Sequence, residues 1–222
     1  MLVAAAVCPH PPLIVPELAG AAAPELDGLR AACADAVAAL RAAAPDLLLV
    51  VGGAETTQVY GPRAAGSLAP WGVDVRVGEG DPVLPLSLTI GRWLLGGEPD
   101  GFQAVATEAG PEECRELGER LAAGVRLALL VMADGSAKLT GKSPGYLDPA
   151  AEPYQRGLVK ALAEADLAAL AVLDPGEADA LWAAGRAPLQ VLAGAAAGAE
   201  LRPELVLECA PYGVGYAVAV WS

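Results

Sequence analysis

The sequence has one histidine and few aromatic residues: its 222 residues include one Phe, five Tyr and four Trp. A catalytic triad would therefore have to use His10, and an HExxH zinc motif is excluded. With so few aromatics, we expect a core of Leu, Val and Ala. A chain of this length buries about 70% of its unfolded surface, so it needs neither a metal nor a disulfide to stay folded.

Basic residues are also scarce. The sequence has 14 Lys and Arg against 27 Asp and Glu, a net charge of -13, and it contains no basic run. A nucleic-acid-binding protein needs a cationic face that displaces counterions from phosphates. The same negative charge is repelled by an anionic membrane surface. We therefore expect neither nucleic acid nor a membrane as a partner.

Paired cysteine motifs and long apolar runs are absent as well. Cys8, Cys33, Cys114 and Cys209 include no CxxC pair, which favours reduced, mostly buried thiols in a cytosolic protein. No bulky apolar run approaches the roughly 18 residues of a membrane-spanning helix. The opening MLVAAAVCPHPPL has no Lys or Arg before its apolar stretch, which favours a first strand over a signal peptide. These features predict a cytoplasmic location.

What the chain does have is an alternation of apolar strands and amphipathic helices. This order predicts parallel strand pairs with right-handed crossovers. We expect one α/β domain over residues 1–222, with a mostly parallel central sheet flanked by helices. Residues 9–18 should form an extended loop, Gly52 and Gly53 should end the second strand, and the long apolar strand at 125–133 should be central. The expected strands are 2–8, 47–51, 73–77, 102–107, 125–133, 205–208 and 214–221, and the expected helices are 24–44, 86–95, 111–123, 150–165, 177–184 and 188–196.

Candidate polar residues follow the carboxyl ends of four predicted strands, where ligands bind in open α/β sheets. His10 lies between prolines that stiffen its loop, so it is either a ligand or base, or a polar residue on a turn. Asp134 after the central strand is either a ligand or the cap of the next turn. Glu55 and Glu208 fit a site or a solvated surface, and Cys209 fits a soft metal ligand or an inert thiol.

The segment after the central strand supplies further candidates. It is rich in Gly and Pro and is expected to overhang the cleft. Lys138 and Lys142 would either meet an anionic ligand there or remain solvated, and Ser136 would face the same substrate. Ser136 could in principle be a nucleophile with His10, but it lacks the GxSxG context. A P-loop and a GxGxxG fingerprint are also absent.

Four blocks along nearly the whole chain carry a family resemblance. They are CPHPPLIVPEL, PDLLLVVGGAETT, ADGSAKLTGKSPGYLDPAAEPY and APYGVGYAVAV. In order and spacing they resemble the class III extradiol ring-cleavage dioxygenase (LigB-like) superfamily, and most of all an actinobacterial subgroup. The Memo-like proteins have a similar closing block and are more distant. The resemblance implies a LigB-like α/β fold, and a homodimer, because such folds often pair.

The resemblance also implies a metal site that this chain carries only in part. Members that cleave catechols hold Fe(II) with two histidines and a glutamate, a 2-His-1-carboxylate arrangement. Residue by residue, His10 matches the first metal histidine, Glu55 takes the place of the second, and Glu208 is the late carboxylate. The acid/base histidine, which follows Asp-x-Ser in the family, falls on Ala137.

Two functions remain open on this basis. In the first, the chain is a relative that has lost ring cleavage and keeps a binding or structural role without a cofactor. The absence of an acid/base group lowers the rate of such a reaction by about 10²–10⁴-fold. In the second, it is a metal-dependent oxidoreductase. His10, Glu55 and Glu208 would then hold Fe(II), Mn(II) or Zn(II), Asp134 or Tyr212 would move the proton, and the substrate would be a small phenolic or other anionic molecule. Convergence of the three ligands within about 5 Å would favour the metal.

Overall fold

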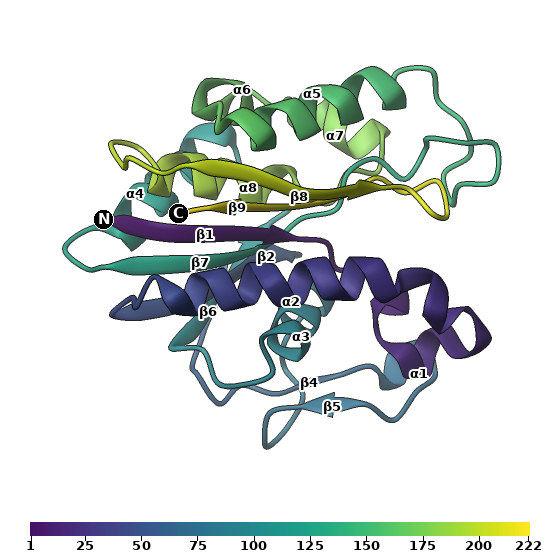
Figure 1. Ribbon diagram of the computed structural model, residues 1–222, viewed down its shortest axis with the longest axis horizontal. Coiled ribbons are helices and arrows are strands. Elements are labelled where there is room, and N and C mark those ends of the chain that lie inside the picture. The colour runs from purple at the N-terminus through teal and green to yellow at the C-terminus, as the bar shows by residue number, and fades with distance from the viewer.

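A seven-stranded sheet forms the middle layer of the protein, as the computed structural model of residues 1–222 shows (Figure 1). The strand order is β3-β6-β2-β7-β1-β9-β8. The inner strands β6, β2, β7 and β1 pair in parallel, β3 is antiparallel to β6, and the β8–β9 hairpin continues the sheet antiparallel to β1. The strands are β1 Leu2–Cys8, β2 Leu47–Ala54, β3 Gln58–Tyr60, β6 Gly101–Ala106, β7 Leu127–Met132, β8 Pro203–Cys209 and β9 Tyr216–Trp221. The mostly parallel α/β fold predicted from the sequence is confirmed.

The strand β7 occupies the centre of the sheet, as its apolar sequence predicts. All six of its residues, LALLVM, are buried, which is typical of a parallel strand covered on both faces. Both β1 and β2 pair with β7. The first strand–helix–strand unit therefore joins parallel strands that are not neighbours, because β7 is inserted between them.

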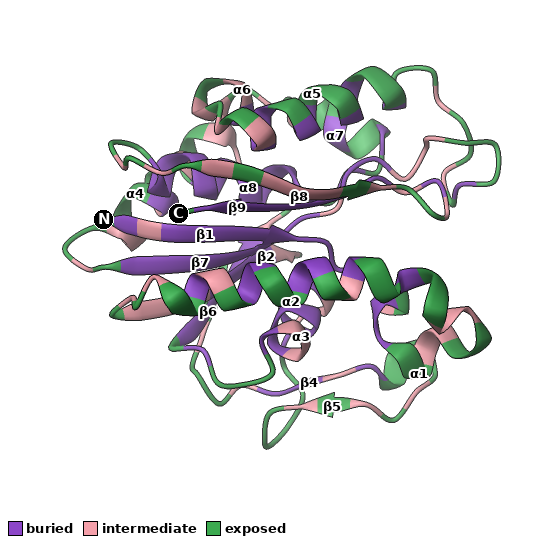
Figure 2. Cartoon of the chain, in the orientation of Figure 1, coloured by how far each residue is buried: buried purple, intermediate pink, exposed green.

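Helices cover both faces of the sheet and enclose two apolar cores (Figure 2). One face packs against α2 and α3, and the other against α4 to α8. The α-helices are α1 Pro16–Ala19, α2 Asp27–Ala42, α3 Leu86–Leu95, α4 Pro111–Ala122, α5 Ala151–Glu164, α6 Leu167–Ala171, α7 Pro175–Ala180 and α8 Arg186–Ala195. The 3₁₀ helices are η1 Pro12–Ile14, η2 Gly20–Leu26 and η3 Ala69–Trp71. None of the helices has the length and apolar character needed to span a bilayer.

The glycine pair in β2 does not end the strand, which corrects the sequence prediction, and Gly52 instead serves close packing. A Cβ built on Gly52 would lie 2.5 Å from Ser87 Oγ at the start of α3. From the other side, a Cβ on Gly91 of α3 would lie 2.5 Å from Val50 Cγ1. The helix and the strand therefore approach each other more closely than larger residues would allow, and β2 continues to Ala54.

Three other predictions differ from the structure. The proline-rich segment expected as an extended loop folds into η1 and α1, because proline is tolerated in the first turn of a helix. The strand expected at residues 73–77 is reduced to β5 Arg76–Val77, which pairs with β4 Gly66–Ser67 in a separate two-stranded sheet. The short helix α6 and the edge strand β3 have no counterpart among the predicted elements.

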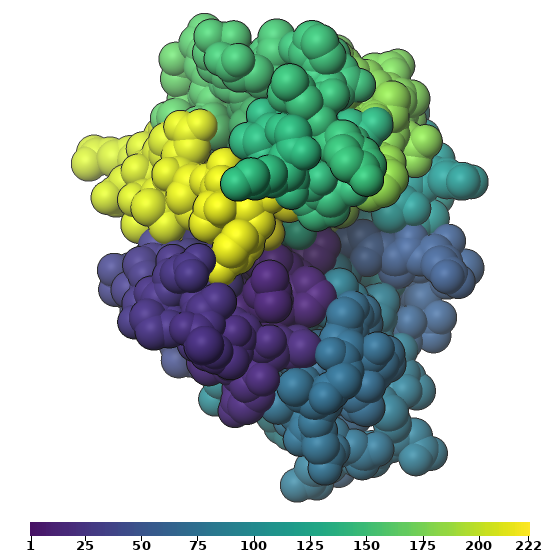
Figure 3. Space-filling model, turned by 90° about the vertical axis from the view of Figure 1, so that its right-hand side faces the viewer, coloured from purple at the N-terminus to yellow at the C-terminus, as the bar shows by residue number.

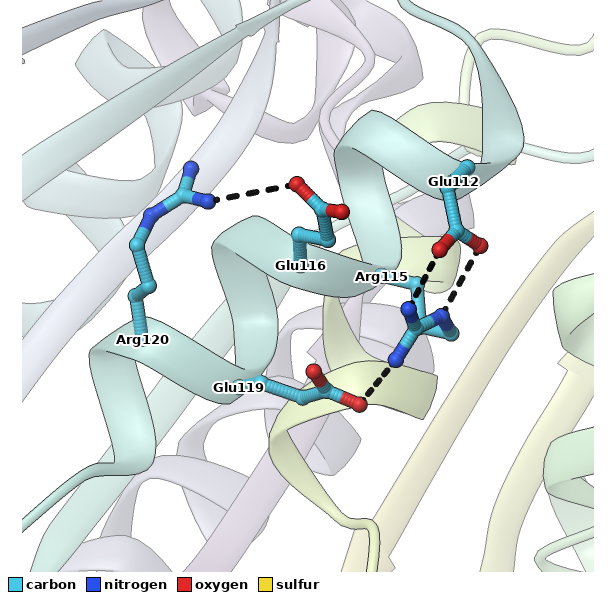
Figure 4. A network of polar contacts seen from close by, with 5 residues as sticks. All are labelled: Glu112, Arg115, Glu116, Glu119 and Arg120. Carbon is cyan, nitrogen blue, oxygen red and sulfur yellow. Dashed lines mark hydrogen bonds and ion pairs between the residues drawn. The ribbon is translucent and has the colours of Figure 1, made fainter.

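The helix α4 shows how one sequence can supply a charged face and a packed face. Arg115 pairs with Glu112 and Glu119, and Arg120 with Glu116, at three- and four-residue spacing on the solvent side (Figure 4). The hydrogen bond with Arg115 lowers the pKa of the Glu112 carboxyl. The opposite side buries Cys114 and Gly118.

Candidate functional site

The carboxyl ends of the parallel strands meet at one edge of the sheet, which is the face shown in Figure 3. A furrow crosses this face between the loop that follows β7 above and the segments that follow β1 and β2 below (Figure 3). Ligands of open α/β sheets bind at such an edge. The residues that follow these strands therefore all lie at this edge of the sheet.

His10 and Asp134 lie together at this edge, at the ends of the neighbouring strands β1 and β7. The backbone N–H of His10 donates a hydrogen bond to Asp134 Oδ1 at 2.7 Å, and the same oxygen lies 3.6 Å from His10 Nδ1. Only 7% of the His10 surface is exposed, and Nδ1 is buried without a hydrogen-bond partner. Asp134 therefore holds the His10 loop in position across the two strands, and its side chain makes no hydrogen bond to the turn that follows it.

Tyr216, at the start of β9, also belongs to this site, although no sequence pattern singles it out. Its side chain is buried. Burial, followed by the negative charge of Asp134, raises the pKa of the Tyr216 phenol. The phenol therefore stays protonated at neutral pH and adds a neutral polar group beside the pair.

Ser136, which the sequence analysis placed at the substrate, has its side chain engaged within the protein. The residue is fully buried, and its hydroxyl donates to the carbonyl of Leu181 at 2.9 Å. Its backbone N–H donates to Gln155 Oε1 at 3.1 Å. Ser136 is thus a structural link between the loop after β7 and the α5 and α7 helices.

The structure does not bring the three predicted metal ligands together. No group of three or more His, Cys, Asp and Glu side chains is placed to hold a metal ion. Glu55 is exposed, and Glu208 lines a surface pocket of about 460 Å³ beside Glu152 and Arg156 of α5. Strand order explains the separation: β2 lies on one side of β1, beyond β7, and β8 lies on the other, beyond β9. The residues present therefore do not fit the metal that the resemblance implies.

The remaining predicted residues make separate contacts. The Tyr212 hydroxyl donates to Glu25 Oε2 at 3.0 Å, so it joins two surface segments. The Lys138 ammonium lies 5.6 Å from the centre of the Trp182 ring, a cation–π contact. Lys142 is exposed, and Cys209 is a half-buried free thiol.

Comparison with known proteins gives a likeness of fold. No family model and no curated protein matches the sequence. Among solved structures, the chain is similar to the uncharacterized protein JW3007 from Escherichia coli K12. The match has a TM-score of 0.62 and 16% sequence identity, and it covers 99% of both chains. At this identity the likeness supports the α/β architecture alone.

Proposed function

We propose that the protein is an extradiol dioxygenase-like α/β protein that binds a small molecule at the carboxyl edge of the sheet, beside His10, and does not cleave aromatic rings. The observation that carries the binding role is the position of the His10 imidazole at the carboxyl end of β1, where Asp134 Oδ1 lies 3.6 Å from Nδ1 and accepts the His10 backbone N–H. A carboxylate beside one ring nitrogen orients the imidazole and leaves the other nitrogen for a ligand. With Nδ1 facing Asp134, the Nε2 atom is the ring nitrogen left to meet a ligand.

The donor set supports the loss of ring cleavage. Ala137 stands where the family has its acid/base histidine, and alanine cannot transfer a proton. Glu55 is exposed to solvent and follows β2, whereas Glu208 belongs to β8, which is separated from β2 by β7, β1 and β9. Asp134 accepts the hydrogen bond from the His10 backbone and is thereby engaged. A bound phenol or carboxylate would instead be held by His10 and by the protonated Tyr216 nearby.

The single histidine makes a direct experiment possible. With ¹⁵N-labelled histidine, every imidazole signal in the NMR spectrum belongs to His10. We expect titration with catechol to shift these signals, and His10→Asn to weaken catechol binding at least tenfold by calorimetry. Glu55→Ala is the matched control and should leave binding unchanged, because Glu55 faces solvent.

Metal titration under anaerobic conditions separates the two functions. We expect Fe(II), Mn(II) and Zn(II) to bind at less than one equivalent and to leave the His10 signals in place. One equivalent of metal that is lost in both His10→Asn and Glu55→Ala would establish the metal-dependent oxidoreductase instead. Signals that respond to no phenol or carboxylate at millimolar concentration would refute the binding role.

A further inference from the structure

A second cavity opens at the same edge of the sheet, away from His10. Its volume is about 570 Å³, and it lies between the end of β6 and the segment that joins α7 to α8. Thr107 and Glu108 form one wall, and Trp182, Arg186 and Ala187 form the other. Neither His10 nor Asp134 contributes to the lining, so the cavity is separate from the site proposed above.

Arg186 places a buried positive charge beside this cavity. Only 3% of its surface is exposed. Its guanidinium donates to the backbone carbonyls of Thr107 and Ala109 and to Gln190 Oε1, which are all neutral acceptors. No carboxylate oxygen lies within 4.0 Å of the Arg186 guanidinium nitrogens, the distance that defines an ion pair. Buried charges in proteins are normally paired, so this guanidinium lacks the anion that its environment calls for.

The beginning of α8 adds to the same positive potential. The helix starts at Arg186 behind Gly185, and no side chain caps it. The backbone N–H groups of Arg186 and Ala187 make no hydrogen bond within the protein, and Ala187 lines the cavity. Free N–H groups and the helix dipole both favour an anion at this position.

Trp182 gives the cavity a flat apolar wall in a strained conformation. Its φ angle of 53° lies in the left-handed region, which a bulky side chain rarely adopts. Even so, 56% of the residue remains exposed, so burial of the indole does not compensate for the strain. Strain that is retained without such compensation is typical of ligand-binding positions. The Lys138 ammonium over the indole ring adds a second positive charge nearby.

We infer that this cavity binds a small monocarboxylate with a flat apolar body. The carboxylate accepts hydrogen bonds from the first N–H groups of α8 and is neutralised by Arg186, while the flat body packs against the Trp182 indole. Glu108 and Asp179, both exposed at the cavity, repel anions of higher charge. A singly charged carboxylate is therefore favoured over a phosphate. This site goes beyond the proposed function, since it shares no residue with it.

Benzoate is the probe that we would use, with benzyl alcohol and benzylammonium as neutral and cationic counterparts of the same shape. Calorimetry should show benzoate binding most tightly of the three. We expect Arg186→Gln and Trp182→Gly each to weaken it about tenfold, and Asp179→Asn to strengthen it two- to threefold. Arg156→Gln is the matched control, since Arg156 is an exposed cation paired with Glu152.

The two exposed positions keep the test valid if Arg186→Gln fails to fold, because Trp182→Gly and Asp179→Asn alter no buried contact of the core. Tighter binding of benzylammonium than of benzoate, or weaker benzoate binding in Asp179→Asn, would overturn the inference in favour of a cation site. Benzoate affinity that is the same in Trp182→Gly and wild type would remove the cavity as its location. Benzoate binding that persists in His10→Asn separates this site from the proposed one, whatever the outcome there.

Discussion

Replacing Gly118 or Gly194 by alanine should destabilise the protein, because these glycines let α4 and α8 pack backbone against backbone. A Cβ at Gly118 would lie 2.0 Å from the carbonyl oxygen of Val191 and 2.6 Å from the amide nitrogen of Ala195. A Cβ at Gly194 would lie 2.0 Å from the carbonyl oxygen of Arg115. All of these are backbone atoms, so no side-chain rotation can relieve the overlap.

The size of the effect follows from two opposing contributions. A carbon–oxygen contact needs about 3 Å or more, so the helices would have to move apart by about 1 Å, and overpacking of this kind costs about 1–3 kcal/mol or more. Alanine in a helix interior is favoured over glycine by about 1 kcal/mol. Because the overlap involves rigid backbone on both sides, we place the net loss at about 2 kcal/mol for each substitution.

Urea denaturation followed by circular dichroism measures this loss. Gly157→Ala in α5 is the matched control: it is also a glycine in a helix, and no atom lies within 4 Å of its built Cβ. The control should gain up to about 1 kcal/mol. The double substitution Gly118→Ala/Gly194→Ala should lose less than the sum, since both report on one helix contact. Substitutions at Gly118 and Gly194 that are as stable as Gly157→Ala would refute the close approach of α4 and α8.

Three further predictions concern single side chains. Tyr154→Phe removes a buried hydroxyl that has no partner, so the free energy of unfolding at pH 7 should stay level or rise by about 1 kcal/mol, with the exposed Tyr146→Phe as control. Burial raises the pKa of Tyr154 from 10.0 to about 12, so the stability due to its neutral phenol is present below pH 10 and lost as pH rises towards 12; urea titrations across this range should be flatter for Tyr154→Phe. Ser136→Ala should cost about 1–2 kcal/mol through the lost bond to Leu181, measured by the same titration. Trp182→Gly should raise the thermal midpoint, since glycine relieves about 1 kcal/mol of strain at a φ of 53°, and an unchanged or lower midpoint would argue against that strain.

The strands and long helices could be predicted from the sequence because their apolar periods are strong. The run at β7 is apolar at every position, and only a central strand buries both faces in this way. The order of the strands could not be predicted. That β7 is inserted between β1 and β2 depends on pairing across more than 70 residues of chain, for which local pattern holds no signal. The packing role of Gly52 was hidden for the same reason, because its partner is Ser87 in a distant helix.

The candidate site was predictable only as far as neighbouring strand ends. His10 and Asp134 follow β1 and β7, which pair directly, so the rule about carboxyl ends places them together. Glu55 and Glu208 also follow strand ends, and the family resemblance added their roles as metal ligands, but strand order separates them. Arg186 could have been noticed as a lone charge beside the apolar stretch APLQVLAGAAA, which is unusual for a buried helix.

The separation of the three donors that the resemblance would assign to a metal does not depend on one residue. The loop that holds Ser136 and Ala137 is tied to the chain after α7, since both the Ser136 hydroxyl and the Ala137 N–H donate to the carbonyl of Leu181. Close packing continues at Gly185, where a Cβ would lie 2.8 Å from the carbonyl oxygen of Asp134. A histidine at position 137 would still find Glu55 and Glu208 apart. If the proposed function holds, Ala137→His alone should give no ring cleavage, because the separation of the donors is built into the order of the strands.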